Sequence, residues 1–271
     1  MKVVIFCGGE GLRLREYSPN TPKPMVPIGQ RPILWHLMKY YSHYGHRDFV
    51  LCLGHQPDVI ESYFLHHSEE PSSAVAASAA VRHLVYVEGA DRWSITFADT
   101  GVDASVGMRL YAVRPLLRGE DVFLANYADG LTDAVLPRMI DHLVSRDAVA
   151  SFLSVRPSQT FHVVSAGDDA SVRTIAPAAA ADLWINGGFF VFRQSIFDYL
   201  HENDDLVDRP FRRLIDRGLL TTYRHSGFWA CMDTFKERMT LEDRLARGDA
   251  PWEVWTESQA TQRARDEITG T

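Results

Sequence analysis

A loop near the start of the chain has the residue types of a phosphate-binding loop. The apolar residues 2–7 run into the segment from Gly8 to Arg13, which contains three glycines, and Lys23 follows between two prolines. Glycines let backbone N–H groups approach phosphate oxygens closely, and clusters of such groups bind anions. The spacing matches neither a P-loop nor a dinucleotide-binding loop. The segment therefore predicts a triphosphate site of another kind, and a tight strand-to-helix turn is the plainer alternative.

Two aspartates are candidates for holding a divalent cation. Asp129 follows the apolar residues 122–125, and open α/β sheets bind ligands at the carboxyl ends of such strands. Asp233 follows a short apolar stretch and precedes an amphipathic one, where it could instead serve only to cap a helix. Attack on a phosphorus atom places charge on oxygens that a divalent cation neutralises well, and Mg²⁺ prefers carboxylate and phosphate oxygens.

The apolar patterns that must position these residues predict an α/β chain. Residues 2–7 and 49–53 are predicted strands, and the helical spacing between residues 33 and 41 joins them into a β-α-β unit. Residues 69–80 are rich in Ser, Ala and Pro and are predicted to leave the sheet. Further strands are predicted at 84–87, 94–97, 122–125, 149–155, 161–165 and 172–175, and further helices at 59–64, 109–117 and 136–143.

Charge and cysteine content narrow the class of protein. The net charge of -7 argues against binding to nucleic acid, which needs a basic surface to displace counterions. The three cysteines are widely spaced without a C-x-x-C pair, so neither a disulfide framework nor a zinc site is indicated. No stretch has the pattern of a signal peptide or a membrane span. We therefore expect a cytoplasmic protein with no nucleic-acid or membrane partner.

The motifs taken together resemble those of the sugar-1-phosphate nucleotidyltransferases. The family signature is a strand, then G-G-x-G-T-R-L, then P-K-P-M, and this chain has Gly-Gly-Glu-Gly-Leu-Arg-Leu at 8–14 and Pro-Lys-Pro-Met at 22–25. Over almost its whole length the chain is similar to the cytidylyltransferase branch, whose acceptor is glucose 1-phosphate. The other segments that carry this resemblance are 32–38, 48–52, 99–101, 127–130, 184–190, 223–225, 228–234 and 250–255.

The resemblance implies a fold and an organisation of the chain. The implied fold is α/β, a Rossmann-like mixed sheet flanked by helices, of the nucleotide-diphospho-sugar transferase type with a small β-rich insertion. Residues 1–255 would form a single nucleotidyltransferase domain, with the insertion at about 156–192, and residues 256–271 would form a polar C-terminal tail. The resemblance also implies a homo-oligomer.

The resemblance implies roles for individual residues as well. Asp129 and Asp233 would share Mg²⁺, while Arg13 and Lys23 would steady the triphosphate of CTP, so that Arg13, Lys23 and Asp129 are the expected catalytic residues. The implied nucleotide contacts are Phe6, Cys7, Gly8, Gly9, Glu10, Gly11, Leu12, Arg13, Lys23, Arg109 and Ala128.

The acceptor side of the expected site departs from the family pattern. Asn186, beside Gly187, offers an amide that can both donate to and accept from a hydroxylated acceptor, or it is only a turn residue. Relatives place a Glu-Lys-Pro that grips the sugar phosphate before the position of Trp184, whereas this chain has no lysine between Lys39 and Lys236. Other residues that replace family residues in the site are Leu12, Ala104, Met108 and Ala128.

The predicted function is Mg²⁺-dependent transfer of CMP from CTP to a sugar 1-phosphate, in which the acceptor phosphate attacks the α-phosphorus and pyrophosphate leaves. No side-chain base is required, because the acceptor phosphate is already ionised. Two alternatives stay open, namely transfer to an unusual phosphorylated acceptor of a specialised pathway and a non-catalytic nucleotide-binding descendant. The departures favour these alternatives, whereas the retention of Arg13, Lys23, Asp129 and Asp233 favours catalysis.

Overall fold

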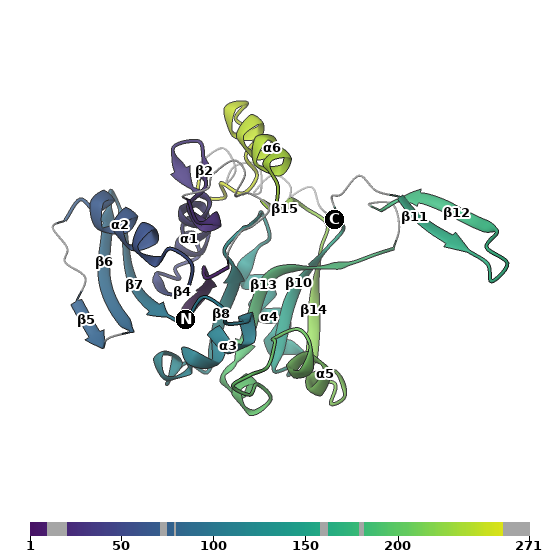
Figure 1. The fold of residues 1–271 in the computed structure, drawn as a ribbon, viewed down its shortest axis with the longest axis horizontal. Helices are drawn as coiled ribbons and strands as arrows, with labels where there is room; N and C mark the ends of the chain where they lie inside the picture. Colours follow the sequence, from purple (N-terminus) through teal and green to yellow (C-terminus); the bar gives the residue numbers. More distant parts are fainter. Residues whose placement is uncertain (10–20, 71–74, 79, 158–161, 179–181, 257–271) are drawn as a thin grey trace.

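The computed structural model describes residues 1–9, 21–70, 75–78, 80–157, 162–178 and 182–256, with the backbone alone for 75–77 (Figure 1). Within these residues a sheet of nine strands has the order β14-β10-β13-β8-β1-β4-β7-β6-β5. The strands are β1 (Lys2–Phe6), β4 (Asp48–Leu53), β5 (Val75–Ser78), β6 (Val81–Glu88), β7 (Asp91–Asp99), β8 (Val122–Tyr127), β10 (Ala150–Val155), β13 (Ile185–Arg193) and β14 (Leu220–His225).

The central strands run in one direction with a single exception. β1 pairs in parallel with β4 and β8, β4 with β7, and β10 with β14, whereas β13 runs antiparallel between β8 and β10. The predicted mixed α/β sheet is confirmed. As a consequence, the carboxyl ends of β1, β8, β10 and β14 and the start of β13 all lie along one edge of the sheet.

Helices cover both faces of the sheet because the strands are apolar on both sides. The helices are α1 (Ile33–His43), α2 (Pro57–His67), α3 (Val106–Ala112), α4 (Leu136–Ser145), α5 (Arg209–Ile215) and α6 (Phe235–Ala246). One buried cluster combines one side of β1 with α1, α2 and α4, and a second combines the other side of β1 with α3 and α5. Among the described helices none has both the length and the apolarity needed to cross a bilayer.

Several predicted boundaries need correction. Residues 75–78 were expected to leave the sheet, but they form its edge strand β5, which pairs antiparallel with β6. Backbone hydrogen bonds suffice to add an edge strand even where the side chains are small. The predicted helix over 109–117 begins earlier, because Ser105 caps α3 by accepting from the Met108 N–H at 3.2 Å, and α3 gives way to the 3₁₀ helix η3 (Arg114–Leu117).

Smaller elements complete the fold. The hairpin of β11 (His162–Ala166) and β12 (Val172–Pro177) projects away from the sheet, as Figure 1 shows. β9 (Gly130–Thr132) pairs with β15 (Trp229–Cys231), and β2 (Pro27–Ile28) pairs with β3 (Arg31–Pro32). Two further 3₁₀ helices are η2 (Lys23–Met25) and η5 (Gln194–Asp198).

Candidate active site

A cavity of about 560 Å³ opens at the carboxyl edge of β1 and β8. Eight of the residues predicted for the site line it, and they come from segments far apart in the sequence: Phe6, Cys7, Gly9, Lys23, Arg109, Ala128, Asp129 and Asp233. Pro24, Val102, Asp103, Ala104, Val106 and Tyr127 complete the lining. The predicted nucleotide contacts Glu10, Gly11, Leu12 and Arg13 lie outside the described residues.

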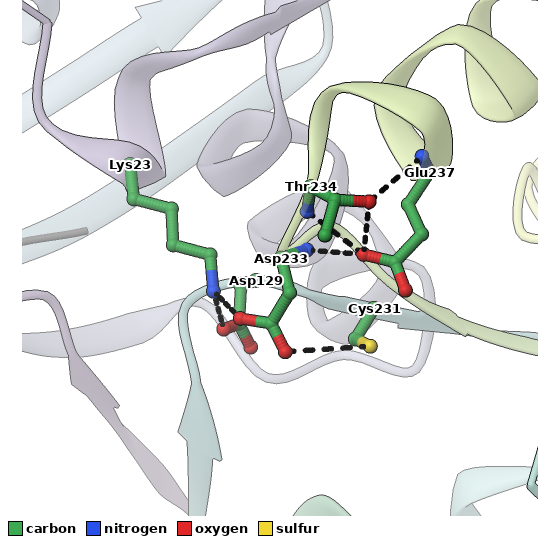
Figure 2. A network of polar contacts seen from close by, with 6 residues as sticks. All are labelled: Lys23, Asp129, Cys231, Asp233, Thr234 and Glu237. Carbon is green, nitrogen blue, oxygen red and sulfur yellow. Dashed lines mark hydrogen bonds and ion pairs between the residues drawn. The ribbon is translucent and has the colours of Figure 1, made fainter. Parts of the chain in front are cut away.

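Lys23 lies between two carboxylates at this cavity (Figure 2). Its Nζ donates to Asp129 Oδ2 and, at 2.5 Å, to Asp233 Oδ1. Burial disfavours the charge on Lys23, but the contacts with Asp129 and Asp233 outweigh this effect and raise the pKa of the lysine. The three side chains therefore form a charged cluster.

Strand pairing brings the two aspartates together although about a hundred residues separate them. Asp129 follows β8 directly, and the adjoining β9 pairs with β15 so that Cys231 lies opposite Gly130. The Met232 N–H then donates to the Asp129 carbonyl at 2.9 Å, which places Asp233 beside Asp129. The cluster thus depends on a short pair of strands that the sequence patterns did not predict.

The sequence allowed Asp233 to be only a helix cap, but in the structure the neighbouring residue caps the helix. Thr234 is the N-cap of α6, and its hydroxyl accepts from the Glu237 N–H at 3.3 Å. The Glu237 carboxylate in turn accepts from the backbone N–H groups of Asp233 and Thr234, each at 2.8 Å. This capping box holds the backbone while the Asp233 carboxylate faces Lys23 (Figure 2).

The donor set of this cluster fits a divalent cation that also binds phosphate. The Lys23 ammonium shows that the space between Asp129 and Asp233 accommodates positive charge. Within the described part of the chain, no group of three or more His, Cys, Asp or Glu side chains could hold a metal by itself. Two carboxylates that leave the remaining positions to phosphate oxygens and water suit Mg²⁺.

Arg109 lines the cavity, but its guanidinium is engaged by the protein itself. Nη1 donates to the carbonyls of Leu53 at 3.0 Å and Gly101 at 2.7 Å and to Thr100 Oγ1 at 2.7 Å. Nη2 donates to the carbonyls of Gly8 and Val102, each at 3.0 Å. Arg109 is only 3% exposed. It therefore ties the glycine-rich loop after β1 to the ends of two neighbouring strands.

The close approach of Arg109 explains one glycine of the loop. A Cβ atom on Gly8 would lie 2.0 Å from Arg109 Nη1, whereas a Cβ on Gly9 would meet nothing within 4 Å. Gly8 is thus required for packing against the guanidinium, and Gly9 faces open space at the cavity. No local sequence pattern distinguishes these two adjacent glycines.

The predicted acceptor residues lie one strand beyond the cavity wall. Asn186 is half-buried at the start of β13, and its amide lies near the hydroxyl of Tyr127, a residue that lines the cavity. The Asn186 Oδ1 accepts from the Gly188 N–H at 2.9 Å. The Gly187 carbonyl accepts from Trp229 Nε1 at 2.8 Å. Tyr127, which the sequence did not single out as a site residue, therefore links Asn186 to the cavity.

The chain is similar to known proteins in its family signature and in its sequence. A family model described as nucleotidyl transferase matches residues 2–230. A protein named probable glucose-1-phosphate cytidylyltransferase, from Bacillus subtilis, is 34% identical and covers 94% of this chain and 100% of its own length. The glucose-1-phosphate cytidylyltransferase of Salmonella typhi is 36% identical with the same coverage of both chains.

Solved structures share the fold at lower sequence identity. UTP-bound UGPase from Acinetobacter baumannii superposes with a TM-score of 0.65 at 17% identity, over 98% of each chain. HddC from Yersinia pseudotuberculosis superposes with a TM-score of 0.61 at 18% identity, over 90% of this chain and 99% of that chain. These two structures support the assignment of the fold.

Proposed function

Because the chain belongs to the nucleotidyl transferase family, we propose that it transfers CMP from CTP to a sugar 1-phosphate and releases pyrophosphate. Relatives named glucose-1-phosphate cytidylyltransferase match at 34% and 36% identity over nearly the full chain, which supports CTP and glucose 1-phosphate as substrates. The observation in the structure that carries the proposal is the cluster of Lys23, Asp129 and Asp233 at the cavity.

In the proposed reaction, an oxygen of the acceptor phosphate attacks the α-phosphorus of CTP. The bond from that phosphorus to the bridging oxygen breaks, and its electron pair leaves with pyrophosphate. The acceptor phosphate is ionised at neutral pH, so no side chain has to remove a proton. The tasks left to the protein are positioning and charge stabilisation, as is general for transfer at phosphorus.

The positive charge in the cavity has proposed roles in these tasks. Lys23 would contact the triphosphate and offset the negative charge that grows on the departing pyrophosphate. Arg13, outside the described residues, is proposed as a second cation for the triphosphate. Arg109 would act indirectly, by holding the Gly8 carbonyl in place beside the cavity.

Asp129 and Asp233 are proposed as the ligands of Mg²⁺. Bound there, the ion would supply a Lewis-acid charge to phosphate oxygens. The backbone of both residues is held by the β9–β15 pair and the α6 capping box. Lys23 offsets the mutual repulsion of the two carboxylates.

The acceptor is proposed to bind at Asn186 and Gly187. Asn186 lies beside Tyr127 of the cavity wall, and its amide can recognise hydroxyl groups. Phe6 to Gly9 and Ala128, at the ends of the parallel strands β1 and β8, are proposed to contact the nucleotide at this cavity.

A homo-oligomer is also proposed, and the β11–β12 hairpin is the suggested contact. Val164, Val172 and Ile175 on this hairpin are 52%, 63% and 66% exposed. Isolated two-stranded hairpins are marginally stable in water, so a second copy of the chain is a reasonable partner for this apolar surface. Light scattering of the native protein and of Ile175→Asp tests this, since the variant should have the smaller mass.

The proposed function is tested by measuring pyrophosphate release with Mg²⁺. CTP, UTP, dTTP, ATP and GTP are each combined with a panel of sugar 1-phosphates, and Asp129→Asn serves as the inactive control. Release that requires CTP, a sugar 1-phosphate and Asp129 is expected. Release that is equal for all five nucleotides, or that persists in Asp129→Asn, contradicts the proposal.

A further inference from the structure

Two arginines lie against one tryptophan beside the acceptor residues. The Arg156 Cζ atom lies 4.9 Å from the Trp184 ring centroid, and the Arg224 Cζ atom lies 5.1 Å from it. Both distances are within the range of cation–π contacts. The chain thus concentrates two positive charges on one aromatic side chain.

The sheet places this group at the same edge as the cavity. Arg156 directly follows β10, Arg224 lies near the carboxyl end of β14, and Trp184 directly precedes β13. Since β13 is the neighbour of β8, whose end carries Tyr127 and Asp129, the arginines extend the row of site residues away from the cavity. Trp184 thus lies just before the strand that neighbours the cavity wall.

Strand register connects the arginines to the proposed acceptor residue. Ser154 pairs with Arg224 on one side and with Asn186 on the other. Paired residues on adjacent strands have side chains on the same face of a sheet. Ser154 is 3% exposed, and its Oγ has no hydrogen-bond partner within the described structure. A row of polar side chains therefore leads from Arg224 through Ser154 to Asn186.

Both arginines can still bind an anion while they contact Trp184. A guanidinium that stacks its face on an aromatic ring can still present N–H groups to a phosphate, often two at once. Arg156 has an ion pair with Asp182 at 3.8 Å, and the side chains are 42% and 86% exposed. An exposed pair of this kind contributes little stability, so a stronger anion can displace Asp182.

The other described cations near the site are already engaged. Lys23 is bound between two carboxylates, and the Arg109 guanidinium donates to five oxygens of the protein. The sequence has no lysine between Lys39 and Lys236 that could meet a second phosphate. Arg156 and Arg224, which lie after β10 and in β14, are the cations on the adjoining strands that could meet a phosphate monoester at the acceptor residues.

We propose that Arg156, Trp184 and Arg224 form the subsite that binds the phosphate monoester of the acceptor, an inference that rests on the proposed function. Trp184 holds the two guanidinium groups together, and Asp182 occupies the subsite until the acceptor arrives. In this subsite, Arg156 and Arg224 supply the positive charge that the phosphate of a sugar 1-phosphate requires.

Steady-state kinetics of Arg156→Gln and Arg224→Gln with CTP and glucose 1-phosphate test the proposal. Loss of one charge-assisted hydrogen bond should raise the KM for glucose 1-phosphate by about tenfold or more and leave the KM for CTP within about twofold. Arg217→Gln is the matched control, because Arg217 also lies on an aromatic ring, 5.5 Å from the Tyr199 centroid. It should change neither KM.

Asp182→Asn provides a test in the opposite direction. Since it removes the anion that competes for Arg156, it should lower the KM for glucose 1-phosphate, whereas a structural role of the ion pair predicts no such gain. If the native protein turns over and both arginine variants keep the native KM for the acceptor, the inference is wrong and the proposed function stands.

Calorimetry tests the subsite even if the native protein shows no activity. If no nucleotide and sugar 1-phosphate pair releases pyrophosphate, the proposed function fails. Titration of glucose 1-phosphate into the native protein and the Arg156→Gln/Arg224→Gln double variant then tests the subsite alone. Binding by the native protein that the double variant loses supports the subsite, and equal or absent binding in both contradicts it.

Discussion

Replacing Arg109 by methionine is expected to destabilise the free protein, before any nucleotide binds. Methionine fills much of the same volume but donates no hydrogen bond. The five oxygens that now accept from Arg109 come from the loop after β1, the end of β4 and the segment 100–102. The variant would therefore separate three segments that meet at the cavity.

The magnitude follows from the burial and the number of these contacts. Hydrogen bonds to a charged group contribute about 1.5–3 kcal/mol each, but bonds that share one guanidinium do not add, and water can enter from the cavity. We expect a loss of about 3–5 kcal/mol in the free energy of unfolding, because the variant leaves five oxygens of the protein without their donor.

Urea unfolding of the nucleotide-free variant measures this loss as a lower midpoint. Gly8→Ala should show a related loss, because its Cβ would lie 2.0 Å from Arg109 Nη1, and Gly9→Ala, which meets nothing within 4 Å, is its matched control. The reasoning is refuted if Arg109→Met unfolds at the native midpoint and differs only in its KM for CTP. That result would make Arg109 a ligand contact and not a support of the loop.

The remaining predictions concern the charged cluster, the helix cap and acid stability. Lys23→Met should bind Mn²⁺ about tenfold more tightly without nucleotide, measured by electron paramagnetic resonance, because the ammonium no longer competes for Asp129, and unchanged affinity would contradict the observed contact. Thr234→Ala should lower the free energy of unfolding by about 1 kcal/mol in urea, because the capping box is lost, whereas Thr240→Ala in the exposed helix should have a smaller effect. Burial opposes ionisation of Asp204, but Arg213 and the His201 N–H outweigh it and lower its pKa, so Asp204 contributes stability that is present above its unfolded pKa of about 3.9 and is lost as pH falls below it. Acid titrations of unfolding should show a weaker dependence on pH below about 4 in Asp204→Asn, and an identical dependence would refute this.

Local patterns predicted the part of the fold that is apolar and continuous. β1, β4 and β8 are buried runs of Val, Ile, Leu and Phe, and the sequence located each of them to within a residue or two. β14 was missed because its residues, Leu-Thr-Thr-Tyr-Arg-His, mix polar and apolar types without a clear period. Its position follows from pairing with β10, a contact that no local pattern encodes.

In the candidate site, too, some features could be predicted from the sequence and others only from the structure. The residue types and the family resemblance led to Lys23, Asp129 and Asp233, and the structure brings these three together. The structure alone revealed that Arg109 binds five oxygens of the protein, because those oxygens are mostly backbone carbonyls, which have no signature in a sequence. The contact of Arg156 and Arg224 with Trp184 was likewise hidden, since it depends on the order of three strands.

The most direct test of the central claim is identification of the product by mass spectrometry after incubation with CTP, glucose 1-phosphate and Mg²⁺. Pyrophosphate release alone could come from hydrolysis of CTP, whereas a CDP-linked sugar forms only by transfer. The account predicts CDP-glucose from the native protein and none from Asp129→Asn or Asp233→Asn. Formation of CMP without a CDP-linked product, or equal product from the two aspartate variants, would contradict it.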